Sequence, residues 1–133
     1  MNGKPSVLLV DDEPGILKIL TIQLKHSGFE TYDTTSGADA VELVRVKNPD
    51  VVLLDVLMPG MGGLEVLEHI REFSKVPVII FTANPKIIEV AREIGVDDCI
   101  PKPYDPDMLI EKIQGVIDKH RQQAASQKNN VNN

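Results

Sequence analysis

The sequence is poor in cysteine and in aromatic residues. Its 133 residues include one cysteine and no tryptophan, and aromatic residues make up 4% of the chain. The single cysteine, Cys99, excludes an internal disulfide and any zinc site built from several cysteines. No apolar run approaches the roughly 18 residues that a membrane-spanning helix needs, and no hydrophobic stretch of a signal peptide follows the first residues. These absences predict an intracellular, cytoplasmic domain with no membrane partner.

Positive charge is also in short supply. The chain has 14 Lys and Arg against 20 Asp and Glu, which gives a net charge of −6. Residues 121–133 hold two of the basic residues and no acidic one, leaving 12 basic and 20 acidic groups, a charge of −8, in residues 1–120. Because binding to nucleic acid depends on a basic surface, this balance predicts no direct contact with nucleic acid.

Short apolar runs alternate with longer segments of helical periodicity. Strands are predicted at residues 7–10, 51–54, 76–81 and 99–100, and a more polar edge strand at residues 30–33. Helices are predicted at residues 14–27, 37–47, 64–73, 86–94 and 106–120. Five successive β–α units predict an α/β fold, a doubly wound parallel sheet of five strands with helices on both faces. The domain is expected to span residues 1–120, and the polar residues 121–133 to form a disordered tail or the beginning of a linker.

Acidic, hydroxyl and basic side chains collect where the predicted strands end. Asp11 and Asp12 follow the first strand, Asp55 follows the third, Thr82 the fourth, and Lys102 the fifth. Taken singly, an Asp before a helix is usually an N-cap and a Thr at a strand end is usually a turn residue. Sites in doubly wound sheets form at the carboxyl ends of the strands, however. The joint occurrence of these residues therefore predicts a functional site.

The side-chain types in this set favour one chemistry. Two carboxylates about 5 Å apart repel by roughly 3 kcal/mol at an effective dielectric constant of about 20, so three clustered aspartates require a cation. Oxygen ligands without nitrogen or sulfur favour Mg²⁺, with Mn²⁺ or Ca²⁺ as substitutes. Lys102 supplies a point charge for a phosphoryl oxygen, and Thr82 supplies a hydroxyl donor. The set predicts a phosphoryl group held between a metal and a lysine, with the central Asp55 as nucleophile.

Four longer motifs extend this pattern over most of the chain. They are residues 7–14 (Val-Leu-Leu-Val-Asp-Asp-Glu-Pro), 55–63 (Asp-Val-Leu-Met-Pro-Gly-Met-Gly-Gly), 81–83 (Phe-Thr-Ala) and 95–104 (Gly-Val-Asp-Asp-Cys-Ile-Pro-Lys-Pro-Tyr). In this order and spacing, they resemble the receiver domain of response regulators in bacterial two-component signalling, over residues 6–119. The resemblance implies a flavodoxin-like sheet with strand order 2-1-3-4-5.

The resemblance also implies roles for the carboxylates. Asp55 corresponds to the residue that is phosphorylated in the family. Asp11 and Asp12 correspond to the acids that bind Mg²⁺, and Asp55 together with the backbone carbonyl of Leu57 completes the protein ligands. The phosphoryl group would come from the phosphohistidine of a sensor histidine kinase or a phosphotransfer protein.

Two further residues have implied roles in the response to phosphorylation. Thr82 corresponds to the hydroxyl that moves toward the phosphoryl group, and Lys102 to the lysine that pairs with it, with a cis bond to Pro103. The implied function is a signalling switch, not an enzyme beyond its own phosphoryl transfer and dephosphorylation. The implied downstream partner is an effector domain or protein. The resemblance also implies a weak dimer of the chain through residues 86–120.

Three features depart from the family pattern. Cys99 stands where the family usually has Tyr or Phe as an aromatic switch, so Thr82 is expected to move without a coupled aromatic side chain. Thr82 and Gly95 are 13 positions apart, closer than in the family, which shortens the loop at residues 84–86 and places the usual output surface in question. Gly62 replaces a common Asp or Asn and is expected to loosen the loop after the third strand.

Two other functions compete with this interpretation. A haloacid-type phosphatase also uses Asp, Lys, Thr and Mg²⁺, but it needs an Asp two positions after the first nucleophilic Asp, where this chain has Glu13 after Asp11. A flavodoxin-like module that binds a nucleotide or flavin needs a phosphate-binding loop after the first strand, and the acidic residues there would repel an anion. The sequence does not decide whether the chain is a stand-alone regulator or part of a longer protein.

Overall fold

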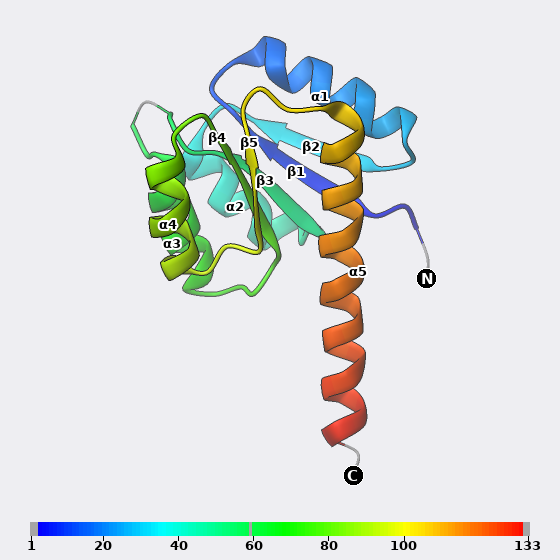
Figure 1. Cartoon of the computed structure of the whole chain (residues 1–133). Helices are drawn as coiled ribbons and strands as arrows, with labels where there is room; N and C mark the ends of the chain where they lie inside the picture. The colour runs from blue at the N-terminus through cyan, green and yellow to red at the C-terminus, as the bar shows by residue number, and fades with distance from the viewer. Residues whose placement is uncertain (1–2, 59, 132–133) are drawn as a thin grey trace.

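Five parallel strands form a single sheet in the order β2-β1-β3-β4-β5 (Figure 1). The computed structural model describes residues 3–58 and 60–131, with side chains described as far as Ser126. The strands are β1 (Ser6–Val10), β2 (Glu30–Thr34), β3 (Val51–Asp55), β4 (Val78–Thr82) and β5 (Asp98–Pro101). The helices are α1 (Pro14–His26), α2 (Gly37–Lys47), α3 (Gly63–Arg71), α4 (Pro85–Ile94) and α5 (Pro106–Val131). The predicted fold class and strand order are confirmed.

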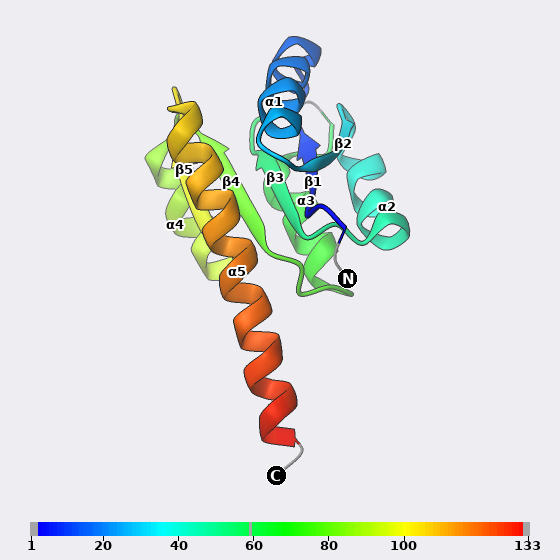
Figure 2. The same cartoon turned by 90° about the vertical axis from the view of Figure 1, so that its right-hand side faces the viewer.

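Helices cover both faces of the sheet. α1 and α5 pack on one face, where Leu20 and Ile113 join a core cluster with Leu9 of β1. α2, α3 and α4 pack on the other, where Val44 joins a cluster with Leu8. In Figure 2, α5 passes in front of β5 and β4, and α4 lies behind them. Successive strand residues alternate between the two faces, so Leu8 and Leu9 are both fully buried, and each contributes roughly 1.5–3 kcal/mol.

The position of each strand agrees with its polarity. β2 is polar and lies at an edge, where it pairs with β1 in the register Ser6↔Glu30 to Val10↔Thr34. β3 lies in the centre and all five of its residues are buried. As a result, the last residue of β3, Asp55, lies between the ends of β1 and β4.

Proline, asparagine and glycine lie at the ends of α1 and α4. Pro14 begins α1, and Gly28 follows it with a φ of 94°. Asn84 caps α4, accepting a hydrogen bond from the Lys86 N–H at 3.0 Å, and Gly95 ends this helix with a φ of 113°. Because glycine adopts this left-handed conformation without steric cost, the chain turns sharply from α1 into β2 and from α4 toward β5.

The last helix, α5, is longer than predicted. The sequence predicts a helix over residues 106–120 and a disordered tail or the beginning of a linker over 121–133, whereas α5 continues to Val131. The domain boundary at residue 120 stays a prediction. No proline or glycine follows Gly115, and alanine, glutamine and basic residues favour the helix. An ion pair of 3.5 Å joins Arg121 Nη2 to Asp50 Oδ1, and α5 then projects away from the sheet (Figure 1). None of the described helices is long and apolar enough to span a membrane.

Candidate functional site

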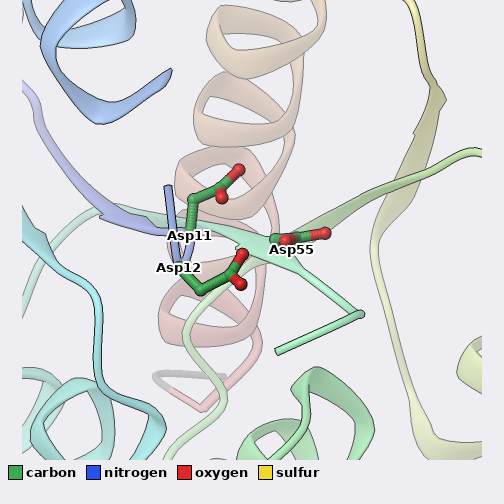
Figure 3. A group of neighbouring side chains, drawn as sticks. All are labelled: Asp11, Asp12 and Asp55. Carbon is green, nitrogen blue, oxygen red and sulfur yellow. The ribbon is translucent and has the colours of Figure 1, made fainter. Parts of the chain in front are cut away.

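Three carboxylates meet at the carboxyl ends of β1 and β3. Asp11 and Asp12 directly follow β1, and Asp55 is the last residue of β3. One carboxylate oxygen from each residue lies within 4.8 Å of those of the other two, and Figure 3 shows the three side chains gathered at the ends of the two strands. Asp11 is 0% exposed and Asp55 is 4% exposed. The structure thus brings together the three acids that the sequence singled out.

Backbone amides hold two of these carboxylates in place. The Glu13 N–H donates to Asp11 Oδ1 at 2.9 Å, and the Leu57 N–H donates to Asp55 Oδ1 at 3.4 Å. Each bond links an aspartate to the amide two residues further on, as in an Asx turn. Each carboxylate therefore shapes the loop that follows its own strand. The role of the Leu57 carbonyl as a metal ligand stays a prediction.

Burial and mutual repulsion change the protonation of the cluster. Burial raises the pKa of Asp11 from 3.8 to about 6, and the neighbouring charge of Asp55 adds to the rise. Burial also raises the pKa of Asp55, although the Lys102 ammonium opposes this shift. Desolvation dominates in both cases because a carboxylate charge is costly away from water. A bound cation would reverse both shifts, because it favours the charged form of each group.

A lysine faces the same carboxylates from the fifth strand. Lys102 follows β5, and its Nζ lies 3.4 Å from Asp55 Oδ1 and 3.7 Å from Asp11 Oδ2. The same Nζ lies over the ring of Phe81, 4.5 Å from the ring centroid, a distance at which a cation is attracted to an aromatic face. The bond between Lys102 and Pro103 is cis, as the resemblance implied. The ammonium therefore offsets part of the negative charge of the cluster.

Thr82 lies on the same rim, but its hydroxyl is bonded elsewhere. It is the last residue of β4, is 3% exposed, and pairs in register with Pro101 of β5. Its Oγ1 accepts from the Asn84 N–H at 3.1 Å, and its carbonyl accepts from the Lys102 N–H at 3.1 Å. Within the described residues, no hydrogen bond joins the hydroxyl to Asp55. The structure places Thr82 beside the carboxylates without joining it to them.

The acidic cluster has the ligand types of a divalent-cation site. Asp11 Oδ2 is buried and has no hydrogen-bond partner among the described residues. Leaving such an atom unsatisfied is costly, and a bound cation would satisfy it. Magnesium prefers one or two carboxylates together with water and phosphoryl oxygens. The residues present therefore fit a magnesium ion held at Asp11, Asp12 and Asp55.

Two adjacent glycines, Gly62 and Gly63, lie where the chain passes from β3 into α3, next to Asp55. A side chain at Gly63 would overlap the backbone of Asp55 and Val56, so glycine allows α3 to begin directly beneath the end of β3. Gly62 is different, because its φ is −72° and a Cβ there would lie 3.5 Å from its nearest neighbour, the Val56 carbonyl oxygen. Gly62 caps α3 without a side-chain hydrogen bond. The departure from the family pattern thus leaves α3 without a side-chain cap.

The ring in contact with Lys102 Nζ belongs to Phe81, which the sequence did not mark as a site residue. Phe81 was recognised only as part of a motif, since its contact with Lys102 depends on how β4 and β5 lie side by side. Cys99, at the usual aromatic position, is partly buried in β5. Burial raises the pKa of its thiol, although the charge of Arg92 opposes the shift. A raised pKa lowers the fraction of reactive thiolate, which argues against Cys99 as a reactive thiol.

Charged residues near β5 are already paired within the chain. Lys112 Nζ lies 3.3 Å from Asp98 Oδ2, and Arg71 Nη2 lies 3.1 Å from Asp97 Oδ1. Asp97, Asp98 and Lys112 belong to the segment through which a weak dimer was predicted, at residues 86–120. Their internal pairs explain their presence without a second copy, and the dimer stays a prediction.

Comparison with known proteins places the chain in one family. Residues 7–114 match the family model of the response regulator receiver domain. The structure is similar to the Vibrio cholerae chemotaxis protein CheY4, with 26% identity, a TM-score of 0.80, and coverage of 86% of this chain and 99% of that one.

Two other solved structures show the same similarity. One is the receiver domain of the Francisella response regulator 1452, with 28% identity, a TM-score of 0.82, and coverage of 87% of this chain and 98% of that one. The other is a LuxR-family two-component response regulator from an Aurantimonas species, with 26% identity, a TM-score of 0.82, and coverage of 88% and 87%. The chain belongs to the response regulator receiver domain family, whose members are phosphorylation-dependent signalling regulators rather than dedicated enzymes.

Proposed function

We propose that this receiver domain accepts a phosphoryl group on Asp55 from the phosphohistidine of a sensor histidine kinase or a phosphotransfer protein. The observation that carries the proposal is the buried Asp55 carboxylate at the end of the central strand, with acids of β1 on one side and Lys102 on the other. The acids supply the ligands for a divalent cation, and the lysine supplies a charge for a phosphoryl oxygen.

The transfer uses Asp55 as the nucleophile. An Asp55 carboxylate oxygen forms the new bond to phosphorus while the phosphorus–nitrogen bond of the donor histidine breaks, and its electron pair returns to the imidazole. The three carboxylates and the Leu57 carbonyl would hold Mg²⁺, which would neutralise negative charge on the phosphoryl oxygens. Lys102 Nζ, already 3.4 Å from Asp55 Oδ1, binds one of these oxygens. The product is a mixed anhydride, which water then hydrolyses.

Phosphorylation changes the charge balance around Asp55. An aspartyl phosphate carries nearly two negative charges and three strong acceptor oxygens in place of one carboxylate. Lys102 moves from its position beside Asp11 toward the phosphoryl oxygens. The Thr82 hydroxyl, which now accepts from the Asn84 N–H, gives up this bond and donates its proton to a phosphoryl oxygen. Because Asn84 caps α4, the exchange shifts the population of loop and α4 conformations that a downstream effector reads. Because Cys99 stands where the family usually has an aromatic side chain, no ring at this position moves together with Thr82.

Labelling with acetyl phosphate tests the proposal. With MgCl₂ present, intact-mass measurement should show one added phosphoryl group on the chain, and none after addition of EDTA. Asp55→Asn should abolish the label, whereas Asp33→Asn, which changes an exposed carboxylate on β2, should label as the parent does. An Asp55→Asn chain that labels to the same extent would contradict the assignment of the phosphoacceptor.

A second measurement separates the switch from the competing phosphatase. Beryllofluoride with Mg²⁺ should shift the amide NMR resonances of Thr82, Lys102 and α4, because it mimics a phosphoryl group on Asp55. A phosphatase would instead turn over a generic phosphoester many times. Glu13, at the position where such an enzyme needs a second aspartate, has an exposed side chain. Sustained turnover without a conformational shift would overturn the proposed function.

A further inference from the structure

The open edge of β2 has backbone groups that face away from the sheet. β2 pairs only with β1 among the described strands. The Glu30 N–H donates toward β1, and the Thr34 carbonyl accepts from the amide that follows β1. In a parallel strand, alternate residues direct their N–H and C=O groups to opposite sides. The N–H and C=O groups of Thr31 and Asp33 therefore face outward, where an added strand would bond them.

Two hollows flank this edge on opposite faces of the sheet. The hollow on the α1 side has a volume of about 410 Å³, and its lining includes Leu17, Lys18, Thr21, Ile22 and Asp33. The hollow on the α2 side has a volume of about 340 Å³, and its lining includes Asp33, Asp39, Glu42, Leu43 and Val46. Figure 2 shows β2 at the right-hand side of the sheet, with α1 above it and α2 below it.

The two hollows differ in chemistry. On the α1 side, Ile22 is 61% exposed and lines the hollow together with Leu17, so this hollow offers an apolar surface. On the α2 side, Val46 is 67% exposed and lies beside the exposed acids Asp39 and Glu42. An apolar side chain suits the first hollow. A basic side chain suits the second, with its aliphatic stem over Val46 and its charge at the acids.

We propose that the open edge of β2 is a docking site for an extended segment of another protein in which basic and apolar residues alternate. The backbone of that segment bonds to the outward N–H and C=O groups of Thr31 and Asp33, as in β-strand addition. Because side chains of a strand point alternately to opposite faces, its apolar residues enter the α1-side hollow and its basic residues enter the α2-side hollow.

Charge selects this partner over a second copy of the chain. Two β2 edges paired with each other would bring Glu30 and Asp33 of one copy close to those of the other, and like charges across strands are destabilising. Residues 1–120 carry a charge of −8, which attracts a basic segment and repels another copy. The docking site is independent of phosphorylation at Asp55, since it uses none of the residues of that site.

A labelled peptide of alternating lysine and valine tests the docking site, with binding measured by fluorescence anisotropy. The parent chain should bind it, and binding should protect the amides of Thr31 and Asp33 from hydrogen exchange in NMR spectra. Val46→Lys and Asp33→Lys should each weaken binding at least about tenfold. Val90→Lys is the matched control, because Val90 is an exposed valine, 46% exposed, on the distant α4.

A second peptide separates strand addition from simple charge attraction. The same sequence with alternate backbone nitrogens methylated keeps its charge but cannot form the ladder, and it should bind at least about tenfold more weakly. Equal binding of both peptides would overturn the proposal. The proposal would also be overturned if the peptide did not bind, or if it bound without protecting the amides of Thr31 and Asp33. An equal loss of binding in Val90→Lys and in the β2-edge variants would overturn it too. So would a dimer of the chain in which these two amides are protected.

Discussion

Replacing Asp11 with asparagine tests whether the acidic cluster lowers the stability of the metal-free protein. Asp11 is 0% exposed, and its pKa is raised from 3.8 to about 6. The folded state therefore holds this proton more tightly than the unfolded state. The stability that results is fully present below about pH 4 and is lost as pH rises through about 6. At 1.36 kcal/mol for each pKa unit, ionised Asp11 lowers the free energy of unfolding by up to about 3 kcal/mol near pH 7.

Asp11→Asn should therefore be more stable than the parent near pH 7 in EDTA, by about 1–3 kcal/mol. Asparagine does not ionise, and its carbonyl oxygen can still accept the Glu13 N–H. Urea unfolding followed by circular dichroism measures the difference. Near pH 4.5 the difference should shrink, because the parent is then protonated at Asp11 as well. Saturating MgCl₂ should stabilise the parent and leave the variant nearly unchanged.

Asp33→Asn serves as the control, since it removes the same charge from an exposed position on β2. Its stability should differ little from that of the parent at either pH. A metal-free Asp11→Asn chain that is less stable than the parent near pH 7 would refute the reasoning. Equal stabilisation of the parent and of Asp11→Asn by MgCl₂ would place the bound ion somewhere else.

Three further substitutions test particular contacts. Phe81→Leu removes the ring under Lys102 Nζ, so phosphorylation by acetyl phosphate should slow by about two- to fivefold in a time course; an unchanged rate would show that the ring does not position the lysine. Gly62→Asn gives α3 a side-chain cap at a φ of −72° and should raise the free energy of unfolding in urea by about 0.5–1 kcal/mol; a lower stability would contradict this. Asp97→Ala removes an acceptor shared by Arg71 Nη2 and a β4 amide, so it should cost about 2–3 kcal/mol, and a loss below about 0.5 kcal/mol would show that the contact contributes little.

The sequence predicted the sheet because its physical signals are local. Residues 51–54 are continuously apolar, as expected for a strand covered on both faces, and β3 is buried throughout. The polar residues of β2 marked an edge. Gly28 and Gly95 directly follow the predicted helices 14–27 and 86–94, and both have the positive φ that glycine tolerates. The carboxylate cluster could also be anticipated, since strand ends in a parallel sheet share one rim.

Contacts that depend on strand register could not be predicted in this way. The position of the Phe81 ring under Lys102 Nζ follows from the pairing of β4 with β5 and from the turn after β5, which no local pattern specifies. The length of α5 was missed for another reason. A polar segment such as 121–131 has the composition of a disordered tail and also the propensity of a helix, and continuation from an existing helix avoids the cost of nucleation.

The opposite end of the sheet is held by a half-buried arginine, Arg71. Arg71 donates to Asp97 Oδ1 at 3.1 Å. It also donates to three backbone carbonyls, those of Gly95, Ser74 and Val76, at 3.0, 3.3 and 2.7 Å. Asp97 Oδ1 in turn accepts from the Val78 N–H at 2.8 Å. The start of β4 and the chain entering β5 are thereby tied to α3.

This anchoring bears on which elements can move when Asp55 is phosphorylated. β4 and β5 are held at their amino ends. The buried side chains of β4 pack on both faces of the sheet, and Ile100 of β5 packs on one, so the strands resist moving as units. In α4, Ala91 is the buried residue and Val90 is 46% exposed, so this helix has less packing to lose than the sheet does. A response to phosphorylation is therefore expected in α4 and its loop, with β4 and β5 unmoved, because that is the change that costs the least buried contact.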